Sequence, residues 1–331
     1  MSKLNSTTRR DFCKALAAAP LAAVAAPHLA LGQAAYPTKP IRFILPFGAG
    51  GVADTTSRLV AEKLGDKLGQ RFVVENMAGA GGISAARAAM QAGNDGYAML
   101  LMTNGTAISV PLFKTLPYDP LKDFVPVSSI GTFECLLTVN ASSPYKTLED
   151  WIKAAKEKPG KLNIGTITAG STQHLTAELF KSTAGLDFVI VPSRTTGEAV
   201  VALLRNDVDM VIDFYAALKP GLQDNKTRAL AWSGPTPSPS LPDIPAAIKT
   251  VPNFEVVSWN AMYAPAGTPQ QVIETLNKAL REVLADAALK KRALELGIDL
   301  KASAPAEIHA RLQSDIKKWA AVIERAKIER Q

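Results

Sequence analysis

The chain has 331 residues, 47% of them hydrophobic, and 37 Lys and Arg against 30 Asp and Glu give a formal net charge of +7. Its basic residues form no run interleaved with aromatic residues, which argues against nucleic acid as a partner. Only two cysteines and three histidines occur in the sequence, so we expect no zinc site of the usual kinds and no cofactor.

The N-terminus is typical of an export signal. The segment TRRDFCK at 8–14 precedes an alanine- and leucine-rich run at 15–31, which predicts a twin-arginine signal over residues 1–34. An ordinary secretory peptide would lead to the same compartment. We expect cleavage near Ala34 and a periplasmic product with Cys135 as its single cysteine, which excludes an intramolecular disulfide.

The first unit after the signal is typical of an anion site. An apolar strand at 41–45 leads into Gly48-Ala49-Gly50-Gly51, and Asp54 then begins a helical stripe that extends to Leu68. The first N–H groups of a helix lack internal partners, and glycines let a ligand approach the backbone. The unit has neither a Walker lysine nor Gly-x-Gly-x-x-Gly spacing. It therefore favours a carboxylate over a nucleotide.

Strand-like and helix-like segments then alternate to the C-terminus. We expect strands at 71–75, 97–102, 125–130, 135–139, 162–166, 188–191, 208–213 and 258–265. We expect a glycine loop at 79–82, helices to about 92 and at 151–158, 172–184 and 198–205, and a proline-rich irregular connection at 234–245. This order predicts an α/β protein with mostly parallel sheets and helices on both faces.

The last 60 residues are expected to be helical. A helix should begin with Pro269 at its first position. Two apolar stripes predict core-facing helix surfaces, namely Val272, Ile273, Leu276, Leu280 and Leu284, and then Ile308, Leu312, Ile316, Val322 and Ile323.

Several short segments follow one another along the chain in a characteristic order: YPTKPIR at 36–42, PF at 46–47, GG at 50–51, VEN at 74–76, GAGG at 79–82, DGY at 95–97, LPYDP at 116–120, DF at 123–124, PGKLN at 159–163, HL at 174–175, LPDIP at 241–245 and APAGTP at 264–269. In these segments the chain resembles the Bug (TctC-like) family, the extracytoplasmic solute receptors of tripartite tricarboxylate transport systems. The resemblance covers nearly all of the chain after the signal.

The resemblance implies a two-lobed periplasmic binding protein, of the type II-like class, that closes on a small carboxylate and catalyses nothing. Residues 35–135 plus 258–331 would form lobe 1, and residues 136–257 would form lobe 2. Its partners would be the membrane permease subunits, and it would be a monomer. The implied ligand contacts are Phe47, Gly48, Ala49, Gly50, Gly51, Asp54 and Thr55, then Thr103 and Asn104, and then Ala169, Gly170, Ser171, Thr172 and His174.

The residues themselves leave some of these roles open. For Asp54 we favour a helix cap, because its carboxylate would repel an anion. For Ser171 we favour ligand contact over a cap, and for His174 a half-buried structural role and a site-lining role remain equal alternatives. The glycines at 79–82 resemble a dinucleotide turn, but close packing of a helix on a strand explains them better.

Two departures from the family pattern bear on the ligand. The segment VPSRT at 191–195, which contains Arg194, stands where the family pattern is Val-Pro-Tyr-Lys-Gly, and Phe214 follows Asp213 where many members have Asn. An aromatic face and a guanidinium suit an aromatic carboxylate or dicarboxylate of the terephthalate or phthalate type. One carboxylate would lie on the two helix starts, with the ring against Phe214 and the other end near Arg194. Alternatively, Arg194 faces solvent and Phe214 belongs to the core.

Two other functions, an exported hydrolase and a ligand sensor, are alternatives to the transport receptor. An exported hydrolase could use Ser171 and His174 as a reactive pair, although no Gly-x-Ser-x-Gly elbow is present. A ligand sensor for a signalling system would need the same closing cleft as a transport receptor. The sequence favours a receptor over an enzyme. It does not separate transport from signalling, and transport is the leading interpretation.

Overall fold

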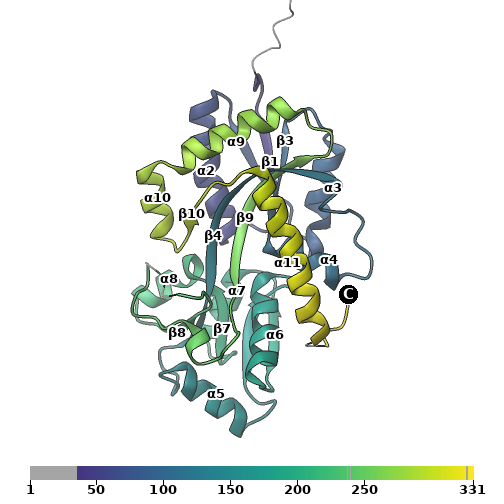
Figure 1. The fold of residues 1–331 in the computed structure, drawn as a ribbon. Coiled ribbons are helices and arrows are strands. Elements are labelled where there is room, and N and C mark those ends of the chain that lie inside the picture. Colours follow the sequence, from purple (N-terminus) through teal and green to yellow (C-terminus); the bar gives the residue numbers. More distant parts are fainter. Residues whose placement is uncertain (1–35, 237, 239, 326) are drawn as a thin grey trace, which may run out of the picture. The chain divides into compact units, whose positions relative to one another are not determined.

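A β-sheet flanked by helices runs through the part of the chain that the structure describes (Figure 1). The computed structural model describes residues 36–236, 238, 240–325 and 327–331, so the predicted export signal lies outside the described residues. The strands are β1 Ile41–Leu45, β2 Phe72–Asn76, β3 Ala98–Thr103, β4 Phe124–Asn140, β5 Asn163–Ile167, β6 Val189–Ser193, β7 Met210–Phe214, β8 Thr227–Trp232, β9 Val257–Pro265 and β10 Asp299–Leu300.

Helices follow most strands, which confirms the predicted α/β class. They are α2 Val52–Leu68, α3 Ile83–Gln91, α4 Asn104–Leu112, α5 Leu148–Glu157, α6 Thr172–Ala184, α7 Thr196–Leu204, α8 Tyr215–Gln223, α9 Gln270–Leu284, α10 Ala287–Leu294 and α11 Pro305–Arg325. Two short 3₁₀ turns, η1 Ala80–Gly82 and η2 Ala247–Lys249, complete the set.

The sheet consists of two parallel groups joined by two long strands. In the order β2-β1-β3-β9-β4-β7-β5-β6, β1 pairs in parallel with β2 and β3, and β5 pairs in parallel with β6 and β7. The strands β4 and β9 pair antiparallel with each other and with these groups. Because parallel strands end at the same edge, the loops that follow them gather there.

One continuous strand replaces the two runs expected at 125–130 and 135–139. β4 pairs with β9 from Phe124 to Glu134 and with β7 and β8 from Cys135 to Asn140. Its ladder with β9 shifts register near Pro126 and near Gly131, and its ladder with β8 shifts between Leu137 and Thr138. The division into two lobes near this change of partner remains a prediction.

The N-caps of two helices differ from their predictions. Gly51 is the N-cap of α2, so Asp54 lies in the first turn and is not the cap. Its carboxylate instead reaches back to the Gly50 N–H (3.0 Å). Pro269 is the N-cap of α9 and not its first residue, because its ψ of 137° is outside the helical range.

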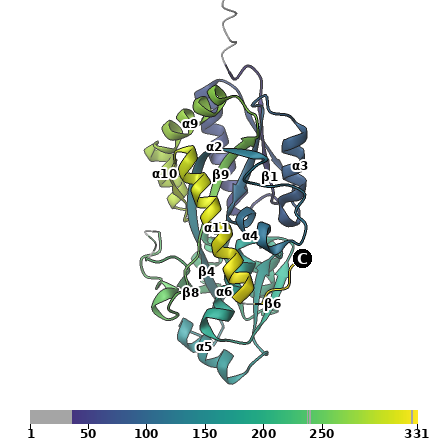
Figure 2. The ribbon, with the colours of Figure 1, turned by 45° about the vertical axis from the view of Figure 1, so that its right-hand side comes forward.

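Both C-terminal stripes face the core, as predicted. The α9 stripe is buried throughout, and in α11 only Ile316 is partly exposed. The short strand β10 interrupts the expected helical end. In Figures 1 and 2, α11 runs down the molecule from the α9 end, and it packs on α4 and β4.

Candidate functional site

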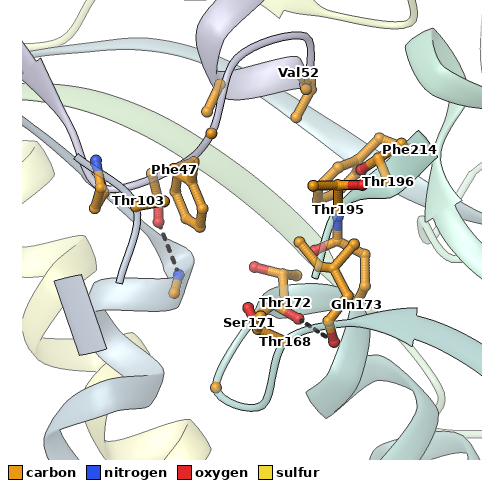
Figure 3. A pocket seen from close by; sticks show the side chains of 18 of the residues that line it. Phe47, Val52, Thr103, Thr168, Ser171, Thr172, Gln173, Thr195, Thr196 and Phe214 are labelled. Carbon is orange, nitrogen blue, oxygen red and sulfur yellow. Dashed lines mark hydrogen bonds between the residues drawn. The ribbon is translucent and has the colours of Figure 1, made fainter. Parts of the chain in front are cut away.

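A cavity of about 850 Å³ opens where the loops after the parallel strands meet. Its wall comes from the loops that lead into α2 and α3, the first turns of α4, α6, α7 and α8, and residues of β4 and β9. In Figure 3, Phe47, Val52 and Thr103 face Thr172, Gln173, Thr195 and Phe214 across it. Residues distant in sequence therefore share one cavity of a size that ligand sites commonly have.

The start of α2 presents main-chain donors to this cavity. Its first intrahelical hydrogen bond runs from the Thr55 N–H to the Gly51 carbonyl (2.9 Å), and no described side chain caps the helix. The N–H groups of Val52 and Ala53 precede that bond, and both residues line the cavity. Unpaired N–H groups and the helix dipole make such a start attractive to an anion.

The start of α6 offers a second set of donors. The Ser171 hydroxyl accepts the His174 N–H (3.1 Å), and the Leu175 N–H donates to the Ser171 carbonyl (3.1 Å). These bonds leave the N–H groups of Thr172 and Gln173, and both residues line the cavity. Ser171 is thus a cap and a cavity residue at once.

Two further helix starts meet the cavity and were not expected there. Thr195 caps α7 by accepting the Glu198 N–H (3.2 Å), and Thr196 and Gly197 line the wall beside it. At the start of α8, Ala216 and Ala217 line the wall, and no described side chain caps that helix. The starts of α2, α6, α7 and α8, together with that of α4, thus contribute positive partial charge to one space.

Arg194 is the only ionisable side chain among the described residues that line the cavity. It is exposed, and its guanidinium forms no ion pair with another described residue. Its main-chain N–H donates to Glu198 Oε2 (2.9 Å), which fixes the backbone before α7. The cavity therefore combines one cation with helix starts and contains no acidic side chain in its described lining.

Aromatic side chains provide the apolar part of the wall. Phe47, Phe133 and Phe214 all line the cavity. Phe214 is 6% exposed and packs edge-on against Phe133, with ring centroids 4.7 Å apart at 90°. Phe214 is therefore both a core residue and a cavity residue. The sequence had left these two places as alternatives, and the structure shows that they do not exclude each other.

Most of the predicted contact residues lie at the cavity. They are Phe47, Gly48, Ala49, Gly50, Gly51, Thr103, Ala169, Gly170, Ser171, Thr172, Arg194 and Phe214. Five others lie outside this lining, namely Asp54, Thr55, Asn104, His174 and Asp213. Direct ligand contact by these five residues remains a prediction.

The hydrogen bonds of these residues explain their place. The Asp54 carboxylate accepts the Gly50 N–H, Arg58 Nε (2.9 Å) and Asn76 Nδ2 (3.0 Å), and so braces the loop before α2. Asp213 lies behind the opposite wall, where its Oδ1 accepts Gln173 Nε2 (2.8 Å). Burial raises the pKa of the Asp213 carboxyl.

His174 and Ser171 do not form a nucleophile–base pair. The serine hydroxyl accepts the main-chain N–H of His174 and not its imidazole, and the buried Nδ1 of His174 has no partner among the described residues. Burial lowers the pKa of this imidazole. The described part of the chain also contains no group of three or more His, Cys, Asp or Glu that could hold a metal ion.

Several cavity residues escaped the sequence analysis. The loop Gly79–Gly82 lines the wall, and Gly81 there has a φ of +64° and accepts the Tyr118 hydroxyl (2.8 Å). The capping pattern of Thr195 and Glu198 could have revealed the α7 start. Asn260, in β9, gave no signal of motif or spacing.

No helix among the described residues is long and apolar enough to cross a membrane. Residues 56–328 match the family model described as "Tripartite tricarboxylate transporter family receptor". Protein BugT of Bordetella pertussis is 32% identical, with 87% of this chain and 89% of the relative aligned.

Two solved structures from Rhodopseudomonas palustris are similar in sequence and fold. One protein, determined with adipate, has a TM-score of 0.85 and 31% identity, and the match covers 89% of this chain and 99% of that one. MatC, determined with bound malate, has a TM-score of 0.81 and 30% identity, covering 87% and 100%.

Proposed function

The chain belongs to the tripartite tricarboxylate transporter receptor family, and from that premise we propose that it is a periplasmic receptor that captures a small carboxylate for the membrane permease. One observation carries the proposal: several helix starts and one cation surround a cavity whose described lining has no acidic side chain. Such a lining attracts an anion without a full set of countercharges. Similar proteins have been determined with adipate and malate, both dicarboxylates.

For the ligand itself we propose an aromatic dicarboxylate of the terephthalate or phthalate type. One carboxylate would bind the N–H groups at the starts of α2 and α6. The ring would lie against Phe214, and the second carboxylate would meet Arg194. A planar guanidinium can hold a carboxylate by two parallel hydrogen bonds. The twin-arginine route, the closure of two lobes and the monomeric state belong to the same proposal.

Calorimetry with purified protein tests the ligand class. Terephthalate, phthalate and benzoate would be compared with succinate, adipate and malate. We expect the aromatic dicarboxylates to bind most tightly. Binding of aliphatic acids alone would overturn the aromatic assignment and keep the receptor, whereas no binding of any carboxylate would contradict the receptor itself.

Arg194→Gln tests the position of the second carboxylate. A hydrogen bond to a charged group contributes about 1.5–3 kcal/mol, so we expect affinity for a dicarboxylate to fall about tenfold or more and affinity for benzoate to change little. Arg205→Gln is the matched control, because Arg205 is exposed at the other end of α7 and does not line the cavity. An equal loss of affinity for benzoate and for the dicarboxylate would show that Arg194 does not hold the second carboxylate.

Growth of the host on the acid separates delivery to a permease from signalling. We expect deletion of this gene to abolish uptake of labelled ligand only when the permease genes are intact. A change in gene expression without any change in uptake would favour the sensor instead.

A further inference from the structure

Asn260 is an amide without a structural use in the wall of the cavity. It lies in β9, is 0% exposed and lines the cavity. Neither its Oδ1 nor its Nδ2 has a hydrogen-bond partner among the described residues. Because both ends are unpaired, the observation holds whichever way the amide is turned.

The strand directs this side chain to the cavity. Alternate residues of a strand point to opposite faces, and Ser258 and Asn260 both line the cavity. Trp259 between them points to the other face, where its Nε1 donates to Asp315 Oδ2 (2.7 Å). The amide therefore belongs to the cavity side of the sheet.

Neighbouring polar groups on this wall are satisfied within the protein. Thr103, paired with Asn260 across the sheet, accepts the Gly105 N–H at its Oγ1 (3.0 Å). The Ser258 hydroxyl lies 3.4 Å from Thr172 Oγ1. Leaving a buried polar group unpaired costs folding free energy, and Asn260 leaves two such groups, Oδ1 and Nδ2, unpaired. A bound group would remove this cost.

The chemistry of an amide narrows what that group can be. A carboxylate only accepts hydrogen bonds, so it could pair with Nδ2 but would leave Oδ1 facing an anion. A hydroxyl or a carboxamide both donates and accepts. Resting on the proposed carboxylate function, we propose that Asn260 selects carboxylates that carry a neutral hydroxyl or carboxamide group, while the helix starts hold the charge.

Matched ligands test this assignment by calorimetry. The probes are succinate with malate and succinamate, and terephthalate with 2-hydroxyterephthalate and 4-carbamoylbenzoate. We expect the wild type to prefer a substituted member of one series by about tenfold or more. A preference for malate or 2-hydroxyterephthalate would identify a hydroxyl as the group that Asn260 binds. A preference for succinamate or 4-carbamoylbenzoate would identify a carboxamide. Absence of any preference would overturn the proposal, since water would then satisfy the amide.

Asn260→Leu is the decisive variant. We expect it to lose the preference, so that the ratio of the affinities for the substituted acid and its parent falls by about tenfold, to near one. A preference that survives in Asn260→Leu would overturn the proposal. Thermal unfolding without ligand gives an independent readout: replacing an unpaired amide by an apolar side chain should keep or raise the melting temperature. Asn260→Ala serves if the larger leucine prevents folding.

The outcomes separate this inference from the function on which it rests. Carboxylates that bind with equal affinity to wild type and variant would leave the receptor intact and remove the role of Asn260. Failure of every carboxylate to bind would overturn both.

Discussion

The indole Nε1 of Trp319 donates a hydrogen bond to Asn104 Oδ1 at 2.8 Å, and both side chains are buried. Asn104 Nδ2 in turn donates to Thr172 Oγ1 (3.2 Å). Thr172 is the first residue of α6 and lines the cavity. A chain of hydrogen bonds therefore connects α11 to a helix start at the site.

Trp319→Phe keeps most of the aromatic volume and removes the donor. The buried Oδ1 of Asn104 would then be unpaired, so we expect the free energy of unfolding to fall by about 1–3 kcal/mol, measured by urea denaturation. A double-mutant cycle with Asn104→Ala should give a coupling energy of about 0.5 kcal/mol or more. Additive effects would show that the bond contributes nothing.

Asp54→Asn removes the brace of the loop before α2. Burial alone raises the pKa of the Asp54 carboxyl, but hydrogen bonds from Arg58, Gly50 and Asn76 outweigh it, so the pKa is lowered from its ordinary value of 3.8. The unfolded state then binds more protons near that pH, so this stabilisation is present above about pH 4 and is lost as the pH falls through the folded pKa. We expect a loss of about 1–3 kcal/mol at pH 7 that shrinks in acid.

Asp66→Asn is the control, because Asp66 is exposed in the same helix. Chemical denaturation at pH 3 and pH 7 compares the two variants with wild type. A loss from Asp54→Asn that is equally large at both pH values would contradict the ionic brace.

Gly170→Ala tests the loop that leads into α6. Gly170 has a φ of +80°, and an added Cβ would lie 3.2 Å from Leu112 Cδ2. Gly185 at the other end of α6 also has a positive φ, +61°, with nothing within 4 Å of its Cβ position. Both alanine variants should be destabilised by about 1–2 kcal/mol from backbone strain.

Only Gly170→Ala should also weaken carboxylate binding, because the crowded Cβ displaces the start of α6. Calorimetry with the same acid on both variants checks this. Equal affinities would show that the loop adjusts without moving the donors.

Glu134→Gln tests an acid at the point where β4 changes partners. Burial, and then the charge of Asp299, raise the pKa of Glu134 to about 7 from 4.5. Between these pH values the folded state keeps a proton that the unfolded state has lost, so stability falls as the pH rises. We expect Glu134→Gln to be more stable than wild type at pH 8, by up to about 3 kcal/mol, and equal at pH 4. Melting curves that differ equally at both pH values would contradict the shift.

Periodic apolar patterns predicted the β–α units, because alternation and helical stripes report burial directly. The helix α4 was not predicted: its sequence, NGTAISVPL, contains Gly105 and Pro111, which disfavour helices. A reciprocal capping box between Thr103 and Thr106 and burial against α11 hold it in place. Tertiary packing there overrides local propensity.

The site was predicted where donors belong to a glycine-rich loop and a helix start. It was missed where position depends on the sheet. Asn260 reaches the cavity because β9 lies between β3 and β4. The sequence around Asn260 does not indicate which strands lie beside β9. Gly51 is the N-cap in place of Asp54, with an extended backbone (φ −80°, ψ 174°), and the Asp54 side chain binds back to the Gly50 N–H.

The N–H groups at the starts of α2 and α6 belong to the main chain, and every amino acid except proline carries one. Alanine scanning would therefore leave these groups in place and underrate the loops that hold them. Backbone amide-to-ester replacement at Val52 or Thr172 would probe them directly. Substitutions of the surrounding side chains can therefore change what else the cavity contacts, while the N–H groups themselves remain in place.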